Sequence, residues 1–255
     1  MFLIILIFFT VFVILSSAIF SLKTVELKYL NSINVLAEKD AEVIESGKFR
    51  YGENIFFSSK KNYINNLEKS NPYLRVINIE TIFPSKFIIH AVERNECYVI
   101  KLSNNKYAVL DEYMKVLKIL DVYKNNATNG IEILDSNLKE QEVEAGDFFK
   151  LTDDYFKVLF NSFREWKIEY SDVLSKVTSI QLNYKKQDQL LVNMRSGVSI
   201  VIENSSVQLS DKINLAFTIY DTTEKNGEPV DYTKDGTICV FETETSIYGL
   251  YKPAE

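Results

Sequence analysis

The feature that most constrains this chain is an uncharged apolar segment at its start. Residues 2–20 read FLIILIFFTVFVILSSAIF, and Thr10, Ser16 and Ser17 are their only polar side chains. A helix needs roughly 20 apolar residues to cross a hydrocarbon core of ~30 Å, whereas a helix on the surface of a soluble domain shows a polar face. The segment therefore predicts a transmembrane anchor over residues 1–22 that contacts the membrane through residues 2–20.

A cleavable signal peptide is the alternative for this segment. Small residues at Ser16, Ser17 and Ala18 fit a processing site, but the apolar run exceeds the roughly 7 to 15 residues of a signal core, and no basic residue precedes it. Lys23 and Lys28 follow the run, where the positive-inside tendency keeps lysines cytoplasmic. Because that tendency weakens for long translocated domains, we favour an uncleaved anchor with most of the chain outside the cytoplasm.

Composition and motifs exclude several classes of function. The chain is 46% hydrophobic and 25% charged, which is typical of a globular protein, and its net charge is −6. No cluster of lysine and arginine resembles a nucleic-acid groove, so no nucleic-acid partner is expected. No phosphate-binding or dinucleotide motif is present, and the single histidine, His90, has no nucleophile or ligand motif beside it. We therefore expect no catalytic residues, no cofactor, no metal and no small-molecule substrate.

The two cysteines have two interpretations. Cys97 and Cys239 each lie in an apolar, strand-like run, which favours small buried hydrophobic residues over a disulfide or a metal site. An oxidising compartment would permit a bridge between them. The sequence leaves both interpretations open.

Periodicity predicts a small two-layer unit directly after the anchor. The expected order is strand, helix, helix, strand, strand, over residues 25–29, 37–46, 59–69, 73–81 and 87–94. Gly47 ends the first helix and Asn71 with Pro72 ends the second. Two helices on one face of a three-stranded sheet can bury a core in a unit of this size.

The rest of the chain predicts a mostly antiparallel β domain with flanking helices, so the fold class is α+β. Helices are expected after Thr152 and over residues 210–221, and the first carries an aromatic stripe interpreted as core. Strands are expected over residues 98–102, 107–110, 115–120, 178–184, 189–195 and 198–203, and in a final hairpin of 230–234 with 237–243 across Asp235 and Gly236. Residues 121–147 receive no assignment.

Several short motifs follow the apolar segment in order. They are GENIFF at 52–57, NPY at 71–73, Pro84, Glu93 with Arg94, YAVLD at 107–111, LLVNMRSGVSIVI at 190–202 and VDYTKDGTICVF at 230–241. In combination they resemble the FtsQ/DivIB family of bacterial cell-division proteins. That resemblance implies a transmembrane helix over residues 1–22, a POTRA-like domain over 23–94 and an FtsQ/DivIB-type β domain over 95–255. The chain departs from the family at Asn95 to Cys97, where a proline is usual, and at Glu112, where a glycine is usual.

The resemblance also implies a function. Family members are non-enzymatic, bitopic scaffolds of the divisome that bind FtsB/DivIC-like and FtsL-like partners and help to control septal peptidoglycan synthesis. A single-pass location in the cell membrane at the septum follows, with the bulk of the chain extracytoplasmic. In the family the last strands of the β domain take up the DivIC-type partner, and an exposed strand edge suits strand addition. The matching residues here are Tyr232, Thr237, Ile238, Cys239, Val240 and Phe241.

Two further interpretations stay open beside this one. Glu93 and Arg94 are either a solvated or structural ion pair at a strand end, or they contact another division protein or lie at the junction that orients the POTRA-like and β domains. We place the structural role first. The whole chain has two rival readings, a membrane-anchored or secreted cell-wall enzyme and a POTRA-bearing chaperone or transport component. An enzyme would need a nucleophile or metal motif, and none is recognised in this sequence. A POTRA-bearing chaperone or transport component usually has tandem POTRA units or a membrane barrel, whereas one such unit is expected here.

Overall fold

A computed structural model describes residues 2–15, 18–124, 130–134, 142–151, 154–169, 173–182, 188–221 and 235–254. The chain divides into two compact units. The first comprises Met1–Asn95 with Ala145–Asp147, and the second comprises Glu96–Glu144 with Phe148–Glu255. Each unit has its own hydrophobic core, so each is treated by itself.

The apolar start of the chain forms helix α1 (Phe2–Leu15) and a short 3-10 helix, η1 (Ala18–Phe20). At 1.5 Å per residue, the 14 residues of α1 extend about 21 Å, which is less than a hydrocarbon core of ~30 Å. Among the helices that the structure describes, none is long and apolar enough to cross a membrane. The single transmembrane helix expected over residues 2–20 is therefore not found among them.

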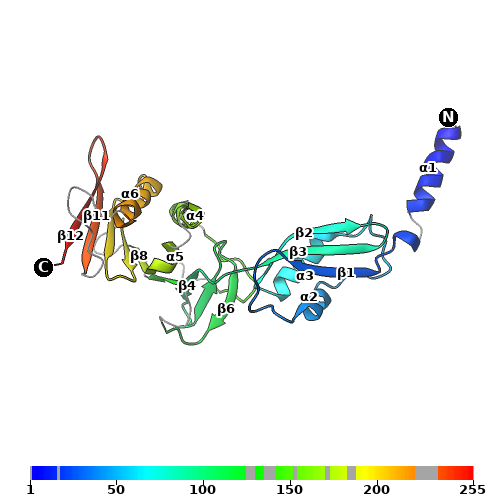
Figure 1. Cartoon of the computed structure of the whole chain (residues 1–255), viewed down its shortest axis with the longest axis horizontal. Coiled ribbons are helices and arrows are strands. Elements are labelled where there is room, and N and C mark those ends of the chain that lie inside the picture. Colours follow the sequence, from blue (N-terminus) through cyan, green and yellow to red (C-terminus); the bar gives the residue numbers. More distant parts are fainter. Residues whose placement is uncertain are drawn as a thin grey trace. The chain divides into compact units, whose positions relative to one another are not determined.

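The first unit has the predicted strand and helix order. Its elements are β1 (Thr24–Tyr29), α2 (Asp40–Ser46), α3 (Lys60–Ser70), β2 (Leu74–Ile82) and β3 (Lys86–Glu93). The sheet order is β1-β3-β2, with β1 parallel and β2 antiparallel to the central β3. Both helices lie on the same face of this sheet (Figure 1).

The core of the first unit follows from two periodicities. On α3, Tyr63 and Leu67 are four residues apart and both are buried against the sheet. On β3, Phe87, Ile89 and Ala91 alternate toward the same core and are all fully buried. The predicted two-layer arrangement is therefore present.

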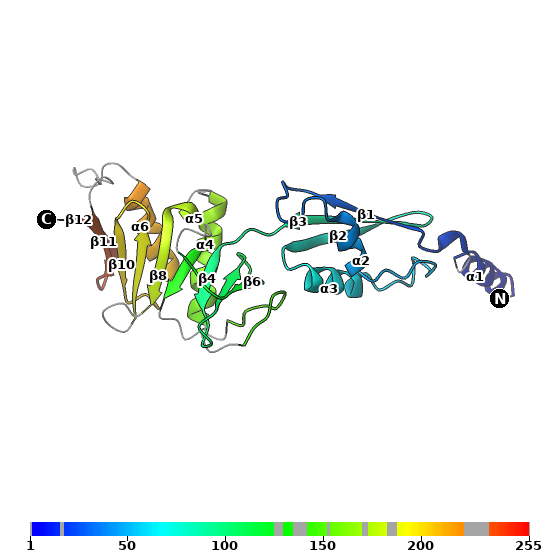
Figure 2. The ribbon, with the colours of Figure 1, turned by 90° about the horizontal axis from the view of Figure 1, so that it is seen from below.

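The second unit is built on a nine-stranded sheet with the order β12-β11-β10-β9-β8-β7-β4-β5-β6. Antiparallel pairs outnumber parallel ones, and the parallel pairs are β4 with β7, β7 with β8 and β10 with β11. Figure 2 shows the strands side by side from β6 to β12. They are β4 (Tyr98–Lys101), β5 (Tyr107–Leu110), β6 (Val116–Leu120), β7 (Ile131–Leu134), β8 (Val177–Leu182), β9 (Gln189–Met194), β10 (Ser199–Glu203), β11 (Gly236–Glu242) and β12 (Ile247–Pro253).

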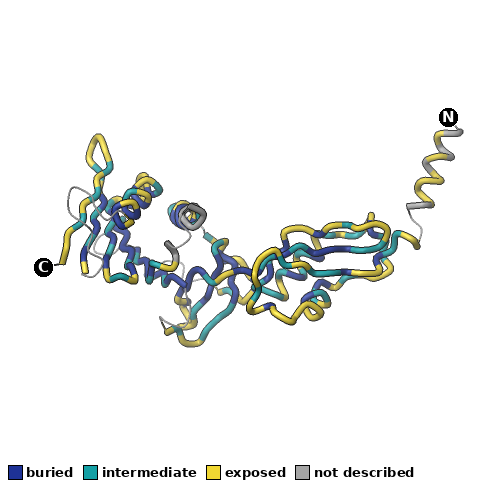
Figure 3. Tube along the Cα trace, in the orientation of Figure 1, coloured by how far each residue is buried: buried dark blue, intermediate teal, exposed yellow. Residues whose placement is uncertain are grey.

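Helices α4 (Asp154–Glu169) and α6 (Leu209–Asp221) cover one face of this sheet, and α5 (Val173–Lys176) precedes β8. The aromatic stripe on α4 is buried as expected, because Phe160 packs edge-on against Tyr98 and Phe163 against Phe217 of α6. Figure 3 shows buried residues along the central strands and exposed residues at the tip of the β11–β12 hairpin.

The structure differs from the prediction at two strands. Strand β7 lies in the region that received no assignment, and β12 was not predicted. Strand β11 forms an antiparallel hairpin with β12, from Gly236 opposite Pro253 to Glu242 opposite Ile247. This is a different hairpin from the one expected between 230–234 and 237–243. Residues 230–234 lie outside the described part of the chain, as does Tyr232.

Candidate partner-binding surface

The predicted partner strand is an interior strand of the sheet. Residues Thr237 to Val240 of β11 pair in parallel with β10, and the whole of β11 pairs with β12 on its other side. Its backbone groups are therefore already used within the sheet. The expectation that Thr237 to Phe241 form an open strand edge is wrong, because β12 follows and covers that edge.

The open edge belongs to β12. It is the first strand in the sheet order, and no other described strand pairs with its outer side. An edge strand presents backbone N–H and C=O groups that an incoming strand can bond. Strand addition at this end of the sheet would therefore involve β12 directly and β11 only through side chains.

The two faces of the β11–β12 hairpin have different environments. Ile238 and Val240 of β11 are fully buried beneath α6. Gly249 of β12 lies opposite Val240, and a Cβ atom at Gly249 would collide with Cδ1 of Ile219 on α6. A larger residue at this position would therefore require the end of the Ile219 side chain to shift.

The other face carries exposed apolar side chains. Phe241 is 37% exposed, and the side chains of Tyr248 and Leu250 are 48% and 44% exposed. Phe241 lies opposite Tyr248 in the register, and their rings stack with centroids 6.1 Å apart. Cys239 lies opposite Leu250 and is half-buried. We call Phe241, Tyr248 and Leu250 the hairpin patch, and exposed patches of this kind are frequent at protein interfaces.

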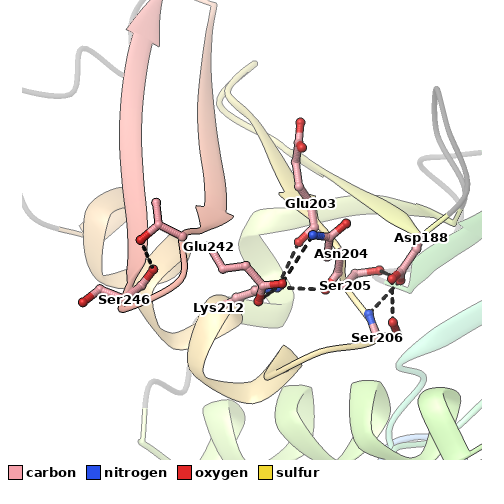
Figure 4. Close-up of polar contacts among 9 residues, drawn as sticks. Asp188, Glu203, Asn204, Ser205, Ser206, Lys212, Glu242 and Ser246 are labelled. Atoms are coloured by element: carbon pink, nitrogen blue, oxygen red, sulfur yellow. Dashed lines mark hydrogen bonds and ion pairs between the residues drawn. The ribbon is translucent and has the colours of Figure 1, made fainter.

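A buried lysine fixes the ends of the strands that carry this patch (Figure 4). Lys212 of α6 is fully buried, and its Nζ donates to the carbonyl oxygens of Glu203 (3.1 Å) and Asn204 (2.8 Å) at the end of β10. It also pairs with Oε2 of Glu242 at 2.9 Å. The three ammonium donors thus have three acceptors, which joins α6, β10 and β11.

The electrostatics of Glu242 follow from this contact. The hydrogen bond from Lys212 lowers the pKa of the Glu242 carboxyl below its ordinary value, and a weaker bond from the side chain of Asn204 acts in the same direction. Just beyond Glu242, the N–H of Thr243 donates to the carbonyl of Ser246 at 2.9 Å and closes the hairpin. The turn that leads into β12 is therefore set by Lys212 and by this bond.

Asp188 makes a second polar cluster beside the first (Figure 4). Its carboxylate accepts hydrogen bonds from Oγ of Ser205 (3.0 Å), from the N–H of Ser206 (2.7 Å) and from Oγ of Ser206 (2.5 Å). These bonds join the start of β9 to the turn between β10 and α6. The cluster has a structural role in positioning α6.

Glu93 is buried inside the first unit, where it organises a loop. Its carboxylate accepts hydrogen bonds from the backbone N–H groups of Asn34 (3.0 and 3.1 Å), Val35 (3.2 Å) and Leu36 (2.8 Å). The Asn31 side chain bonds to both the N–H and the carbonyl of Glu93. Burial is the largest cause that raises the pKa of nearby Tyr29 to about 12, and the negative charges of Asp40 and Glu93 act in the same direction.

Arg94 points to a different part of the same unit. Its guanidinium contacts Oε2 of Glu68 on α3 at 3.0 Å and the carbonyl of Leu74 at 3.1 Å. Oε1 of Glu68 in turn accepts from the N–H of Val76. Glu93 and Arg94 thus bond to separate elements, and their suggested role at the domain junction stays a prediction.

Metal and thiol chemistry have little support in the described part of the chain. No group of three or more His, Cys, Asp or Glu side chains is found there that could hold a metal ion. His90 contacts Oε2 of Glu80 at 2.8 Å near the surface. Cys97 and Cys239 are not joined by a disulfide.

Sequence reasoning missed Tyr248 and Leu250, which the structure brings next to Phe241. Their signal was the alternation of Tyr248, Leu250 and Lys252 with Ile247, Gly249 and Tyr251. Gly249 and Pro253 concealed it, because both residues are unfavourable in strands.

Comparisons with known proteins agree with this architecture. Residues 20–94 match the family model of the FtsQ-type POTRA domain. A cell division protein DivIB from Clostridium tetani is 29% identical over 206 residues, covering 78% of this chain and 69% of the relative. A cell division protein DivIB from Clostridium botulinum is 26% identical over 203 residues, covering 78% and 72%. These findings support the FtsQ/DivIB family, and the resemblance inferred from the sequence is confirmed.

Proposed function

Proceeding from the FtsQ/DivIB family of cell-division proteins, we propose that this chain is a non-enzymatic scaffold of the divisome. It binds FtsB/DivIC-like and FtsL-like membrane proteins through its second unit and thereby helps to control septal peptidoglycan synthesis. The observation that carries this proposal is the open edge of β12 beside the hairpin patch.

The chemistry of this edge favours an extended peptide as the ligand. Main-chain groups along β12 supply hydrogen bonds of the kind used in strand addition, and alternate side chains supply specificity. Tyr248 and Leu250 alternate along β12 on the face away from α6 and offer apolar contact to every second residue of an incoming strand. Thr237, Ile238, Cys239, Val240 and Phe241, together with Tyr232, are retained as the proposed partner-binding region, in which β11 supports the edge and contributes Phe241.

The proposal includes attachment to the cell membrane through residues 2–20. These residues carry no charge, and α1 exposes large apolar side chains such as Ile4, Phe9 and Phe12 to solvent. Burying them in lipid would remove that apolar surface from water. The two folded units would then lie outside the cytoplasm, at the division septum.

Partner capture tests the proposed edge. Leu250→Lys, alone and with Tyr248→Lys, places charge on the hairpin patch without changing the buried face of β12. When the full chain is purified from membranes, we expect that the FtsB/DivIC-like protein no longer co-purifies with these variants. Val122→Lys is the matched control, because Val122 is 70% exposed and follows β6 at the opposite edge of the same sheet.

Imaging of a fluorescent fusion in dividing cells tests the cellular role. The proposal expects a band at midcell, and a uniform envelope signal would count against it. Partner capture that is equal in Leu250→Lys, the double variant and Val122→Lys would refute β12 as the binding edge while leaving the midcell location open.

A further inference from the structure

Three segments that are distant in sequence meet at one end of the three-stranded sheet. The N–H of Leu22 donates to the carbonyl of Glu53 (2.8 Å), and the N–H of Ile55 donates to the carbonyl of Phe20 (2.9 Å). The N–H of Lys23 donates to the carbonyl of Ser85 (2.8 Å), in the turn between β2 and β3. Backbone bonds thus hold residues 20–23, 52–55 and this turn together.

A cluster of phenylalanine rings lies where these segments meet. The ring centroid of Phe20 is 5.2 Å from that of Phe56 and 6.4 Å from that of Phe83, and those of Phe56 and Phe83 are 5.4 Å apart. The cluster is open to solvent, because Phe83 is 59% exposed and Phe56 is 42% exposed. Phe57, which follows Phe56 in the sequence, is 66% exposed. We call Phe20, Phe56, Phe57 and Phe83 the Phe20 patch.

The loop that presents Phe56 and Phe57 is a built part of the fold. Gly52 has φ +86, a conformation that favours glycine, although no atom would obstruct a Cβ there. Oδ1 of Asn54 accepts from the N–H of Phe56 at 3.0 Å, and Ile55 is buried in the core. Ile55 contacts the core while Phe56 and Phe57 are exposed, so the loop presents both rings to solvent.

The position of Phe20 in the chain identifies what covers this patch. Phe20 is the last residue of the uncharged segment 2–20, so it marks where the chain leaves the hydrocarbon core if that segment lies in the membrane. The polar layer on each side of that core is roughly 5 to 8 Å thick. The ring centroids of Phe56 and Phe83 are 5.2 and 6.4 Å from that of Phe20, so their depth differs from that of Phe20 by no more than about the thickness of this layer.

Two lysines that are near the patch in the sequence suit an anionic lipid surface. Lys23 directly follows the first of the three segments, and Lys61 lies in the first turn of α3, shortly after the Phe56–Phe57 loop. Both lysines are exposed. Basic residues beside exposed apolar side chains favour binding to anionic headgroups.

We propose that the Phe20 patch inserts into the headgroup layer of the membrane, so that the folded first unit docks on lipid. This inference rests on the proposed attachment of residues 2–20, and it adds a lipid contact made by the folded unit itself. Strands β1 and β3 run parallel from this end, with Thr24 opposite Lys86 and Tyr29 opposite Ala91. Leu30, which follows β1, therefore lies about 17 to 20 Å farther along the sheet.

Tryptophan quenching by brominated lipids tests this geometry on the full chain. Phe57→Trp and Phe83→Trp each replace one exposed ring with another, and Leu30→Trp is the matched control, because Leu30 is 59% exposed at the far end of the unit. The chain is reconstituted into vesicles of phosphatidylcholine with phosphatidylglycerol. The signal of the unaltered chain, which contains a single tryptophan, is subtracted.

The proposal predicts loss of fluorescence and a blue shift for Phe57→Trp and Phe83→Trp, and neither change for Leu30→Trp. Aqueous acrylamide should give the reverse order of quenching. If all three indoles remain accessible to acrylamide on chains that sediment with vesicles, lipid does not cover the patch and the inference is overturned, which would leave a protein as its occupant. If the unaltered chain does not associate with vesicles, the proposed membrane attachment fails as well.

Discussion

Removing the Glu93 carboxylate should lower the free energy of unfolding of the first unit. In Glu93→Ala, the N–H of Leu36 loses a charged acceptor in a buried place, which costs about 1.5–3 kcal/mol. The N–H groups of Asn34 and Val35 belong to exposed residues that water can reach, so each adds only about 0.5 kcal/mol. We therefore expect the free energy of unfolding of this unit to fall by about 2.5–4 kcal/mol.

Hydrogen exchange of the full chain measures this loss. Some amides of β1 and β3 exchange only when the first unit unfolds. These amides should exchange roughly 60 to 700 times faster, since about 1.4 kcal/mol corresponds to a tenfold change. The strands of the second unit report on specificity and should keep their protection. A single tryptophan located in α4 makes fluorescence unsuitable for following the first unit.

Glu26→Ala is the matched control for this prediction. Glu26 is a glutamate of the same sheet, but its side chain is 45% exposed and pairs with Lys86 at the surface. Exposed pairs contribute about 0–1 kcal/mol, so little change is expected. Equal protection of β1 and β3 in Glu93→Ala and Glu26→Ala would refute the reasoning that the buried carboxylate stabilises this unit.

Three further changes test the hairpin that carries the proposed edge, each by hydrogen exchange of β11 and β12. Lys212→Met removes two hydrogen bonds to part-buried carbonyls and the ion pair with Glu242, and it should destabilise the hairpin by about 2–4 kcal/mol. Lys176→Met, at a side chain 40% exposed, should have little effect. Gly249→Ala should cost about 1–3 kcal/mol through its collision with Ile219, and adding Ile219→Val should restore part of the loss; no recovery would contradict the steric cause. Glu242→Gln should alter how the stability of the hairpin depends on pH. Because the pKa of Glu242 is lowered, its carboxylate stabilises the fold above pH 4.5, its ordinary pKa, and loses this effect as the pH falls through the lowered pKa. The stabilities of the variant and the unaltered chain should therefore converge in acid, and a difference that stays constant with pH would contradict this reasoning.

The parts of the fold that the sequence predicted are those with local periodicity. The spacing of Tyr63 with Leu67 on α3, and of Phe160 with Phe163 on α4, placed these side chains in the two cores before their partners were known. The strand expected over residues 87–94 corresponds to β3 (Lys86–Glu93) in the same way. Short-range spacing carries this information because it depends only on the geometry of one element.

The parts that escaped prediction depend on contacts between distant residues. Nothing near Glu93 in the sequence indicates that its carboxylate would meet three amides of the loop before α2. Likewise, Lys212 resembles an ordinary surface residue of α6 until Glu203, Asn204 and Glu242 are brought around it. The candidate site was predicted one strand away from the open edge for the same reason, since the pairing of β11 on both sides is a property of the whole sheet.

The parallel pairing of β10 with β11 has a consequence for how the proposed edge comes into being. A parallel neighbour cannot be reached by a tight turn, so β11 joins the sheet only through the long connection that contains α6. Such distant pairings form slowly because chain entropy must be lost before the contact is gained. We expect β11 and β12 to join late in the folding of the second unit. A copy in which they had not joined would offer β10 instead of β12 as the edge of its sheet. A partner that binds β12 would therefore select completely folded molecules over incomplete ones.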